Sequence, residues 1–153
     1  MSVTVLSSRE LHRVYPLIPK FLAEFGHPEP FNPAAFGKFW AVLYGADMGR
    51  IFVVEHNGEI VGALGYSTHE DPYTGSKILS EQFWYVEQEH RASGIGLQLI
   101  AAFEHQAQRL GKDWIFLCNL ASLEGEKMDR LYTRKGYKQM ERVYWKKVGG
   151  KES

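Results

Sequence analysis

The residues of this sequence that most clearly could bind a ligand lie in the stretch HRASGIGLQLIAAF, residues 90–103. The stretch follows an aromatic and β-branched run, and it leads into a segment with apolar residues at helical spacing. The first backbone N–H groups of a helix have no intrahelical partner, and the helix dipole makes that end partly positive. Gly94 and Gly96 leave room for a phosphate to approach these donors, while Arg91 adds a cation and Ser93 a hydroxyl donor. The stretch therefore predicts a pyrophosphate site, the alternative being that the glycines only let helix and strand pack closely.

Two common phosphate-binding motifs do not fit this stretch. The P-loop pattern G-x-x-x-x-G-K-[S/T] is absent, and the dinucleotide pattern G-x-G-x-x-G fails because Leu99 stands where its third glycine belongs.

Two segments of the sequence together resemble the signatures of the GNAT superfamily of N-acetyltransferases, in the compact form found in bacteria and their phages. Val86, Arg91 and residues 94–96 are similar to the acetyl-CoA signature V-x-x-x-x-R-x-x-G-x-G/A, and residues 131–147, LYTRKGYKQMERVYWKK, look like the second signature. The sequence departs from the pattern at three positions, where relatives carry Gly, Asn and Ala and this chain carries Ala92, Gly125 and Met128.

The resemblance implies acetyl-CoA as the cofactor and a site at the glycine turn. Backbone N–H groups of six residues would hold the pyrophosphate: Arg91, Ala92, Ser93, Gly94, Ile95 and Gly96. Strand 82–86 would splay from strand 114–119, so that backbone groups near Trp84, Tyr85 and Val86 pair with the pantetheine amides. Asn119 would bond a pantetheine amide or the acceptor, or else only cap its strand.

The resemblance also implies direct attack of a primary amine on the thioester, which needs a base for the amine, stabilisation of the oxyanion and a proton for the thiolate. Tyr132 matches the general acid of the family by position, the alternative being a packing aromatic with its hydroxyl on a backbone carbonyl. Glu81 on the central strand is the first candidate for the base, the alternatives being a water chain or a merely solvated glutamate. Further candidates for the base are Glu55, His69 and Glu70.

Alternation along the central strand places Glu81, Phe83 and Tyr85 on one face and Gln82, Trp84 and Val86 on the other. Cys118 lies in an apolar run, which predicts a small buried side chain rather than an acetyl carrier.

The remaining pattern predicts a mixed α/β (α+β) fold of GNAT type, with a mostly antiparallel central sheet that is flanked by helices and splayed between its fourth and fifth strands. Ser7 or Ser8 caps a helix through Leu11 and Leu22, and a second helix ends near Gly45. Asn57-Gly58 joins two strands into a hairpin over residues 50–67. The other expected elements are strands 3–6, 78–86, 113–120 and 137–148 and helices 95–110 and 126–135.

Length and composition predict one domain over residues 1–153 in the cytoplasm. Eighteen basic and eighteen acidic residues cancel, which argues against a general nucleic-acid or membrane partner. The single cysteine suits a reducing compartment, and no basic-then-apolar leader precedes the domain. We expect a small-molecule or protein amine as acceptor, with a homodimer possible through the aromatic last strand. The alternative function is a non-catalytic acyl-CoA-binding or interaction protein on the same scaffold.

Overall fold

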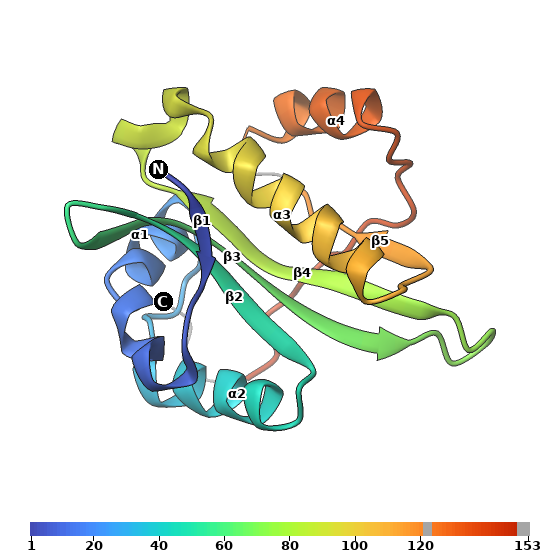
Figure 1. The fold of residues 1–153 in the computed structure, drawn as a ribbon, viewed down its shortest axis with the longest axis horizontal. Coiled ribbons are helices and arrows are strands. Elements are labelled where there is room, and N and C mark those ends of the chain that lie inside the picture. Colours follow the sequence, from blue (N-terminus) through green and yellow to red (C-terminus); the bar gives the residue numbers. More distant parts are fainter. Residues whose placement is uncertain (121–123, 150–153) are drawn as a thin grey trace.

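The computed structural model describes residues 1–120 and 124–149 and contains one sheet of five strands in the order β1-β2-β3-β4-β5 (Figure 1). Strands β1 to β4 are antiparallel to their neighbours, and β5 runs parallel to β4. The bounds are β1 Val3–Val5, β2 Gly49–His56, β3 Glu59–Glu70, β4 Lys77–Val86 and β5 Trp114–Phe116. This confirms the predicted mixed, mostly antiparallel sheet. Residues 121–123 and 150–153 of the predicted domain lie outside the described part.

Helices cover both faces of the sheet (Figure 1). One face carries the 3₁₀ helix η1, Ser8–Val14, with α1, Leu17–Phe25, and α2, Pro33–Gly45. The other face carries α3, Ile95–Arg109, and α4, Gly125–Arg134. A short 3₁₀ helix η2, Gln88–Ser93, connects the end of β4 to α3. Within the described residues, no helix is both long enough and apolar enough to cross a bilayer.

The alternating apolar residues of the strands build one core on each face. Ile51, Val53 and Ala63 face α1 and α2, where Trp40 is only 2% exposed. Phe52 and Leu64 face α3, where Leu99, Ile100 and Phe103 are fully buried. Burial on both faces fixes the register, because a slip of one residue would turn each apolar set to the wrong side.

Several predicted local signals are confirmed. Asn57 and Gly58 both have positive φ, 52° and 80°, as a tight hairpin turn between β2 and β3 requires. Ser7 caps η1 by accepting from the backbone N–H of Arg9. The expected single helix through Leu11 and Leu22 is instead two, η1 and α1, since Pro16 lacks the N–H that would continue the first into the second.

The predicted alternation along β4 is confirmed from Phe83 to Val86 but is wrong at Glu81, which it put on the face opposite to Trp84. The pairing of β3 with β4 shifts register between Gly65 and Tyr66, which leaves Gln82 as an extra residue in a β-bulge. Glu81 pairs with Tyr66, whose ring packs in the core beneath α3. Because paired residues of a ladder project to the same face, the bulge turns Glu81 toward α3, on the side of Trp84.

The predicted strand 137–148 does not form, and the predicted strand 113–120 is paired only over Trp114–Phe116. A strand needs a ladder partner, and the short β5 offers little free edge. The C-terminal segment passes behind the sheet toward α1 and α2 (Figure 1). There the ring of Trp145 packs against Phe25 and His27, with centroids 5.2 and 5.1 Å away.

Gly65 lies where β3 passes under the aromatic core, and its substitution tests this packing. A Cβ at this position would come within 2.6 Å of both Phe83 and Trp40. We expect Gly65→Ala to lower the free energy of unfolding by about 2 kcal/mol because the core has no space for the methyl group. Denaturant unfolding measures this change.

Gly45→Ala is the control, since a Cβ there meets nothing within 4 Å. An unchanged stability for Gly65→Ala would contradict the packing described here.

Candidate active site

Strands β4 and β5 are paired over only three residues each, the last pair being Ser80 and Phe116. Beyond that pair β4 continues to Val86, whereas residues 117–120 leave the sheet. The edge of β4 that faces β5 is therefore without a strand partner from Glu81 onward. This is the predicted splay, and it opens a wedge between the two strands.

The start of α3 stands at the end of this wedge and presents backbone donors. Gly94 adopts φ 84°, a left-handed conformation, and a Cβ there would lie in open space. No side chain of the described residues caps the helix, and its first backbone bond runs from the N–H of Gln98 to the carbonyl of Gly94. The N–H groups of Ile95, Gly96 and Leu97 therefore precede the first intrahelical bond, as an anion site requires. The buried Ile95 side chain anchors this end of the helix in the core.

Gly96 serves packing, which is the alternative that the sequence left open for the two glycines. A Cβ on Gly96 would lie 3.2 Å from the Trp84 ring, so α3 lies close against β4 at this point. The indole Nε1 of Trp84 is buried and has no hydrogen-bond partner among the described residues. An unpaired buried donor is costly unless a ligand satisfies it.

The Arg91 side chain turns toward α1, although the sequence predicted a cation for the anion site. Its guanidinium donates to both carboxylate oxygens of Glu24, at 2.8 and 2.7 Å, and to the carbonyl of Val86 at 2.8 Å. Tyr85 also points to this side, and its hydroxyl donates to Glu24 at 2.6 Å. Only backbone groups of Tyr85 and Arg91 remain for a ligand in the wedge.

The other residues of the turn are exposed and contribute backbone. Ala92 and Ser93 lie in η2, and the Ser93 hydroxyl donates to the His90 carbonyl within the same turn. The predicted hydroxyl donor is thus engaged locally.

Glu81 lies on β4 immediately after the last pair with β5, and it is only 7% exposed. Burial raises the pKa of its carboxyl from 4.5 to about 8, against the opposing effect of a hydrogen bond from the Cys118 backbone. A carboxyl with this pKa gains and loses its proton near neutral pH, as a general base must.

Tyr132 on α4 reaches the same peptide segment from the other side. Its hydroxyl donates to the Cys118 carbonyl at 3.0 Å. This contact is the one expected of a packing aromatic, which was the alternative to a general acid. Burial raises the pKa of the Tyr132 hydroxyl, and the Glu81 carboxylate raises it further, so the hydroxyl stays protonated at neutral pH. The backbone of Cys118 thus brings the two predicted catalytic residues together: its N–H contacts Glu81, and its C=O accepts from Tyr132.

Cys118 itself is exposed, so its predicted burial is wrong. The residue lies beyond the end of β5, where the chain has left the core. Desolvation of the thiol raises its pKa to about 11, and its only hydrogen bond among the described residues is a weak one to the Glu81 carbonyl. A protonated thiol is a poor nucleophile, which argues against an acetyl carrier.

Asn119 organises the start of α4. Its Nδ2 donates to the carbonyl of Gly125 at 2.8 Å and to the carboxylate of Asp129 at 2.5 Å. Its Oδ1 is buried and has no partner within the described residues. The side chain therefore holds the start of α4 and leaves one acceptor without a partner in the described part of the chain, and its contact with a pantetheine amide stays a prediction.

The other candidates for the base lie apart from this cluster. Glu55 is exposed and pairs with Arg13 on η1 at 2.8 Å. His69 and Glu70 lie near the exposed end of β3, and His69 contacts Phe116.

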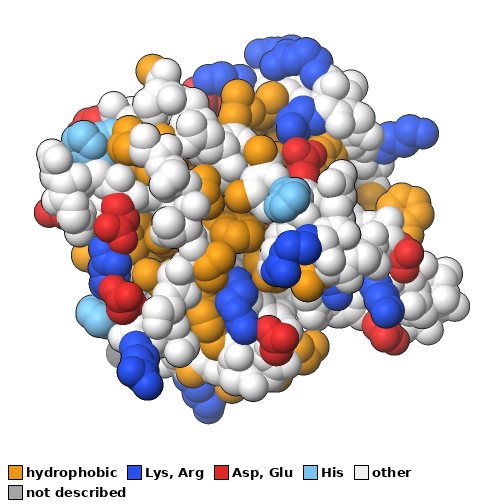
Figure 2. Space-filling view, in the orientation of Figure 1, with side chains coloured by type: hydrophobic (Ala, Val, Ile, Leu, Met, Phe, Trp, Pro, Cys, Tyr) orange, Lys and Arg blue, Asp and Glu red, His pale blue; other side chains and the backbone are white. Residues whose placement is uncertain are grey.

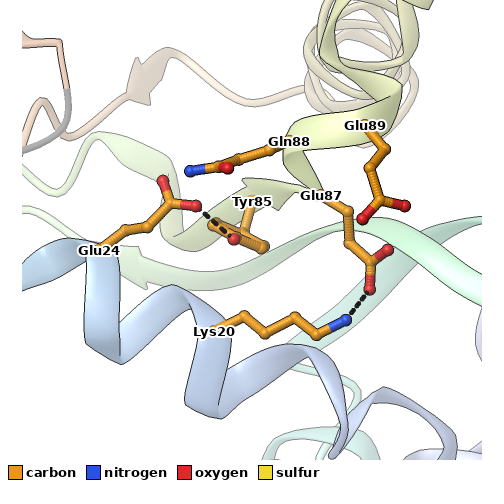
Figure 3. Close-up of a pocket in the computed structure, with 6 residues that line it drawn as sticks. All are labelled: Lys20, Glu24, Tyr85, Glu87, Gln88 and Glu89. Carbon is orange, nitrogen blue, oxygen red and sulfur yellow. Dashed lines mark hydrogen bonds and ion pairs between the residues drawn. The ribbon is translucent and has the colours of Figure 1, made fainter.

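Sequence reasoning missed two residues of α1, Lys20 and Glu24. They line a cavity of about 230 Å³ together with Tyr85, Glu87, Gln88 and Glu89 (Figure 3). Lys20 pairs with Glu87 at 2.5 Å, and Glu24 pairs with Arg91. Their spacing of four residues places both on one face of α1, but it does not reveal partners some sixty residues away in the sequence.

These features fit acetyl-CoA. The start of α3 can take the pyrophosphate, the free edge of β4 can pair with amides in the manner of an added strand, and two buried polar atoms, Trp84 Nε1 and Asn119 Oδ1, await a partner. The described residues on either side of the wedge supply one unpaired donor and one unpaired acceptor, as the two ends of a pantetheine amide require.

Comparisons with known structures show the same fold in acetyltransferases. A ribosomal-protein-alanine N-acetyltransferase from Brucella melitensis biovar Abortus 2308 is 18% identical, with TM-score 0.71 over 97% of this chain and 100% of that chain. An aminoglycoside acetyltransferase from an uncultured soil metagenomic sample, in complex with sisomicin, is 20% identical, with TM-score 0.75 over 96% of each chain. AAC(6′)-Iy in complex with the bisubstrate analog CoA-S-monomethyl-acetylneamine is 19% identical, with TM-score 0.74 over 97% of each chain.

The sequence matches a family model but no individual curated sequence. No curated protein sequence matches the chain. The family model described as "Acetyltransferase (GNAT) domain" matches residues 47–139, which include β2, β3, β4, the glycine turn, α3 and α4. Since this match spans more than half of the chain, the protein belongs to the GNAT family of N-acetyltransferases, whose cofactor is acetyl-CoA.

Proposed function

We propose that this protein transfers the acetyl group from acetyl-CoA directly to a primary amine of a small molecule. One observation carries the proposal: Glu81 and Tyr132 both bond to the peptide of Cys118, at the point where β4 and β5 diverge. A base and an acid that meet the backbone of the same residue match the two proton transfers that the reaction needs.

We assign the binding of acetyl-CoA to the wedge and the start of α3. The N-terminal amides of α3, from Ile95 to Leu97, hold the pyrophosphate, and the indole of Trp84 and the amide of Asn119 take the two unpaired contacts in the wedge. When bound there, acetyl-CoA supplies an activated acyl group in a place that water reaches poorly.

Glu81 acts as the general base. Its carboxyl is nearly buried, so it has few competing solvent contacts, and its raised pKa makes the ionised form a stronger base than an exposed glutamate. Because the Glu81 side chain is only 7% exposed, its carboxylate takes the proton of the alkyl ammonium through one intervening water.

Tyr132 acts as the general acid for the departing thiol. Its hydroxyl is protonated at neutral pH. During the reaction it leaves the Cys118 carbonyl and donates its proton to the thiolate sulfur of coenzyme A. Trp84 lies beside it with ring centroids 6.5 Å apart, so the two rings pack together.

The proposed acceptor is an amine of a small molecule and not of a nucleic acid. The neighbour in complex with sisomicin supports a small-molecule amine. Charge gives no support to a nucleic acid: the chain is neutral overall, and lysine and arginine side chains gather only locally, at the top of the molecule over α4, while both signs are dispersed over the rest of this face (Figure 2).

A homodimer and a cytoplasmic location also belong to the proposal. The last strand, through which pairing was expected, does not form, so the support comes from the exposed side chains of Val143 and Tyr144 on the C-terminal segment. The single cysteine supports a reducing compartment.

Removal of the Tyr132 hydroxyl tests the acid. We expect Tyr132→Phe to lower kcat by about a hundredfold, because the thiolate then leaves without a proton donor, with little change in the Kd for CoA. Thiol release over a panel of primary amines measures kcat, and calorimetry measures the Kd.

Tyr137→Phe is the matched control, because that hydroxyl donates to Glu104 at 2.8 Å. Full turnover by Tyr132→Phe would contradict the assignment. CoA binding without turnover by the wild type over the whole panel would favour the non-catalytic binding protein.

The pH profile tests the base. Because the raised pKa keeps Glu81 protonated below about 8, kcat/KM of the wild type should rise with pH and level off above that value. Glu81→Gln should lower kcat/KM by about a hundredfold and remove the step. A step that persists in Glu81→Gln belongs to another group and would exclude Glu81 as the base.

The same burial predicts a pH-dependent stability. A carboxyl whose pKa is higher in the folded than in the unfolded state favours folding at low pH, and this contribution is lost as pH rises from about 4.5 to about 8. Glu81→Gln should therefore become increasingly more stable than the wild type between pH 5 and 9, as thermal unfolding would show. The exposed Glu70→Gln on β3 serves as control, and a constant difference between Glu81→Gln and wild type would refute a buried, protonated Glu81.

A further inference from the structure

We propose that Glu24 is a positioning residue for the cofactor turn. Together with Tyr85 it holds the Arg91 guanidinium as an anchor rather than as a phosphate ligand, and this anchor fixes the backbone whose amides bind the pyrophosphate. The inference rests on the proposal that acetyl-CoA binds at the turn before α3.

The turn has no buried side chain to hold it in place. Helix η2 has six residues, none of them is buried, and no side chain caps its start among the described residues. The His90 ring contacts that of His56, with centroids 5.1 Å apart, and the N–H of Glu87 donates to the Val61 carbonyl. A segment with no buried side chain depends largely on polar ties to its neighbours to keep one conformation.

Two side chains of α1 provide those ties (Figure 3). Lys20 pairs with Glu87 at 2.5 Å, at the junction of β4 and η2. One turn later, Glu24 accepts from Arg91 and from the hydroxyl of Tyr85, and Gln88 of η2 also donates to it. Both ends of the turn are thus fastened to one face of α1.

The geometry of Arg91 is that of an anchor. Its Nη2 lies 2.8 and 2.7 Å from the two oxygens of Glu24, its Nε donates to the Val86 carbonyl, and the guanidinium lies 5.2 Å from the centre of the Tyr85 ring. A carboxylate in direct contact neutralises the cation and holds it on the α1 side. The bond from Arg91 to the Val86 carbonyl ties residues 86 and 91 together, and the bonds to Glu24 hold both against α1. They therefore fix the position of Gly94 and of the backbone amides that follow it.

The proposal predicts the sign of a charge-neutral substitution. If Glu24 positions the turn, Glu24→Gln weakens CoA binding because the anchor loses its charge partner. If Glu24 merely neutralises a cation that would otherwise attract phosphate, the same substitution tightens CoA binding.

A double-mutant cycle on CoA affinity tests the proposal, with Kd measured by calorimetry on the full chain. We expect Glu24→Gln and Arg91→Gln each to raise the Kd by about tenfold, and the double variant to bind no more than about twofold more weakly than the weaker single variant. The conservative Tyr85→Phe, which keeps the ring and removes only one donor to Glu24, should raise the Kd by about threefold. With saturating CoA, kcat of Glu24→Gln should return to within about twofold of the wild type, since the catalytic groups are untouched.

Glu104→Gln is the matched control for a purely structural effect. Glu104 also accepts from a tyrosine hydroxyl, that of Tyr137 at 2.8 Å, and pairs with a cation, Lys135 at 3.0 Å, but it lies in the second half of α3, ten residues after Gly94. We expect this variant to change the melting temperature without changing the Kd for CoA.

Three outcomes would overturn the proposal: an unchanged or lower Kd in Glu24→Gln, additive effects in the double variant, or an equal rise of Kd in Glu104→Gln. An unchanged Kd in Arg91→Gln would likewise overturn it. Failure of the proposed function gives a different result, namely no CoA binding by the wild type.

Discussion

Beyond the pair of Ser80 and Phe116, the parallel strands β4 and β5 separate, and no other strand of residues 1–120 and 124–149 pairs with the edge of β4 that is left. A buried strand edge has to satisfy its backbone donors and acceptors, so it must be filled by water or by a ligand that can act as a strand. The bulge at Gln82 falls at the same level and turns Glu81 to the side of the opening where Trp84 lies. The proposed cofactor position and the orientation of Glu81, the proposed base, both follow from this local break in the ladder.

The second face of the sheet supports this opening from behind. α1 packs against the sheet through Leu17 and Ile18, and its polar face reaches the cofactor turn through Lys20 and Glu24. A rigid helix that is bonded to an otherwise unsupported turn reduces the entropy that the turn would lose on binding a phosphate. Helix α4, held by Asn119 and Asp129, does the same for Tyr132 on the other side.

Much of the fold could be predicted from the sequence because its signals are local. Asn57-Gly58, Ser7 and the positive φ of Gly94 act through neighbouring residues, and the order of strands and helices follows from apolar periodicity. The features that could not be predicted depend on partners distant in sequence. The bulge in β4 depends on a register with β3, and the failed last strand depends on an edge that β5 does not provide. For the site, the resemblance indicated Glu81 and Tyr132 as candidates, and the structure brings both to the backbone of Cys118. The partner of Arg91 could not be predicted, since nothing in the motif points to Glu24 on α1.

The central claim is that coenzyme A lies between β4 and β5 with its pyrophosphate at the start of α3. A ¹⁵N spectrum recorded during titration with CoA tests it most directly, because the chain has four tryptophans and Trp84 Nε1 is buried without a partner among the described residues. The indole N–H of Trp84 and the amides of Ile95, Gly96 and Leu97 should shift together, while the indole signals of Trp114 and Trp145 stay in place. Shifts confined to other residues, with Trp84 unmoved at saturation, would contradict the account.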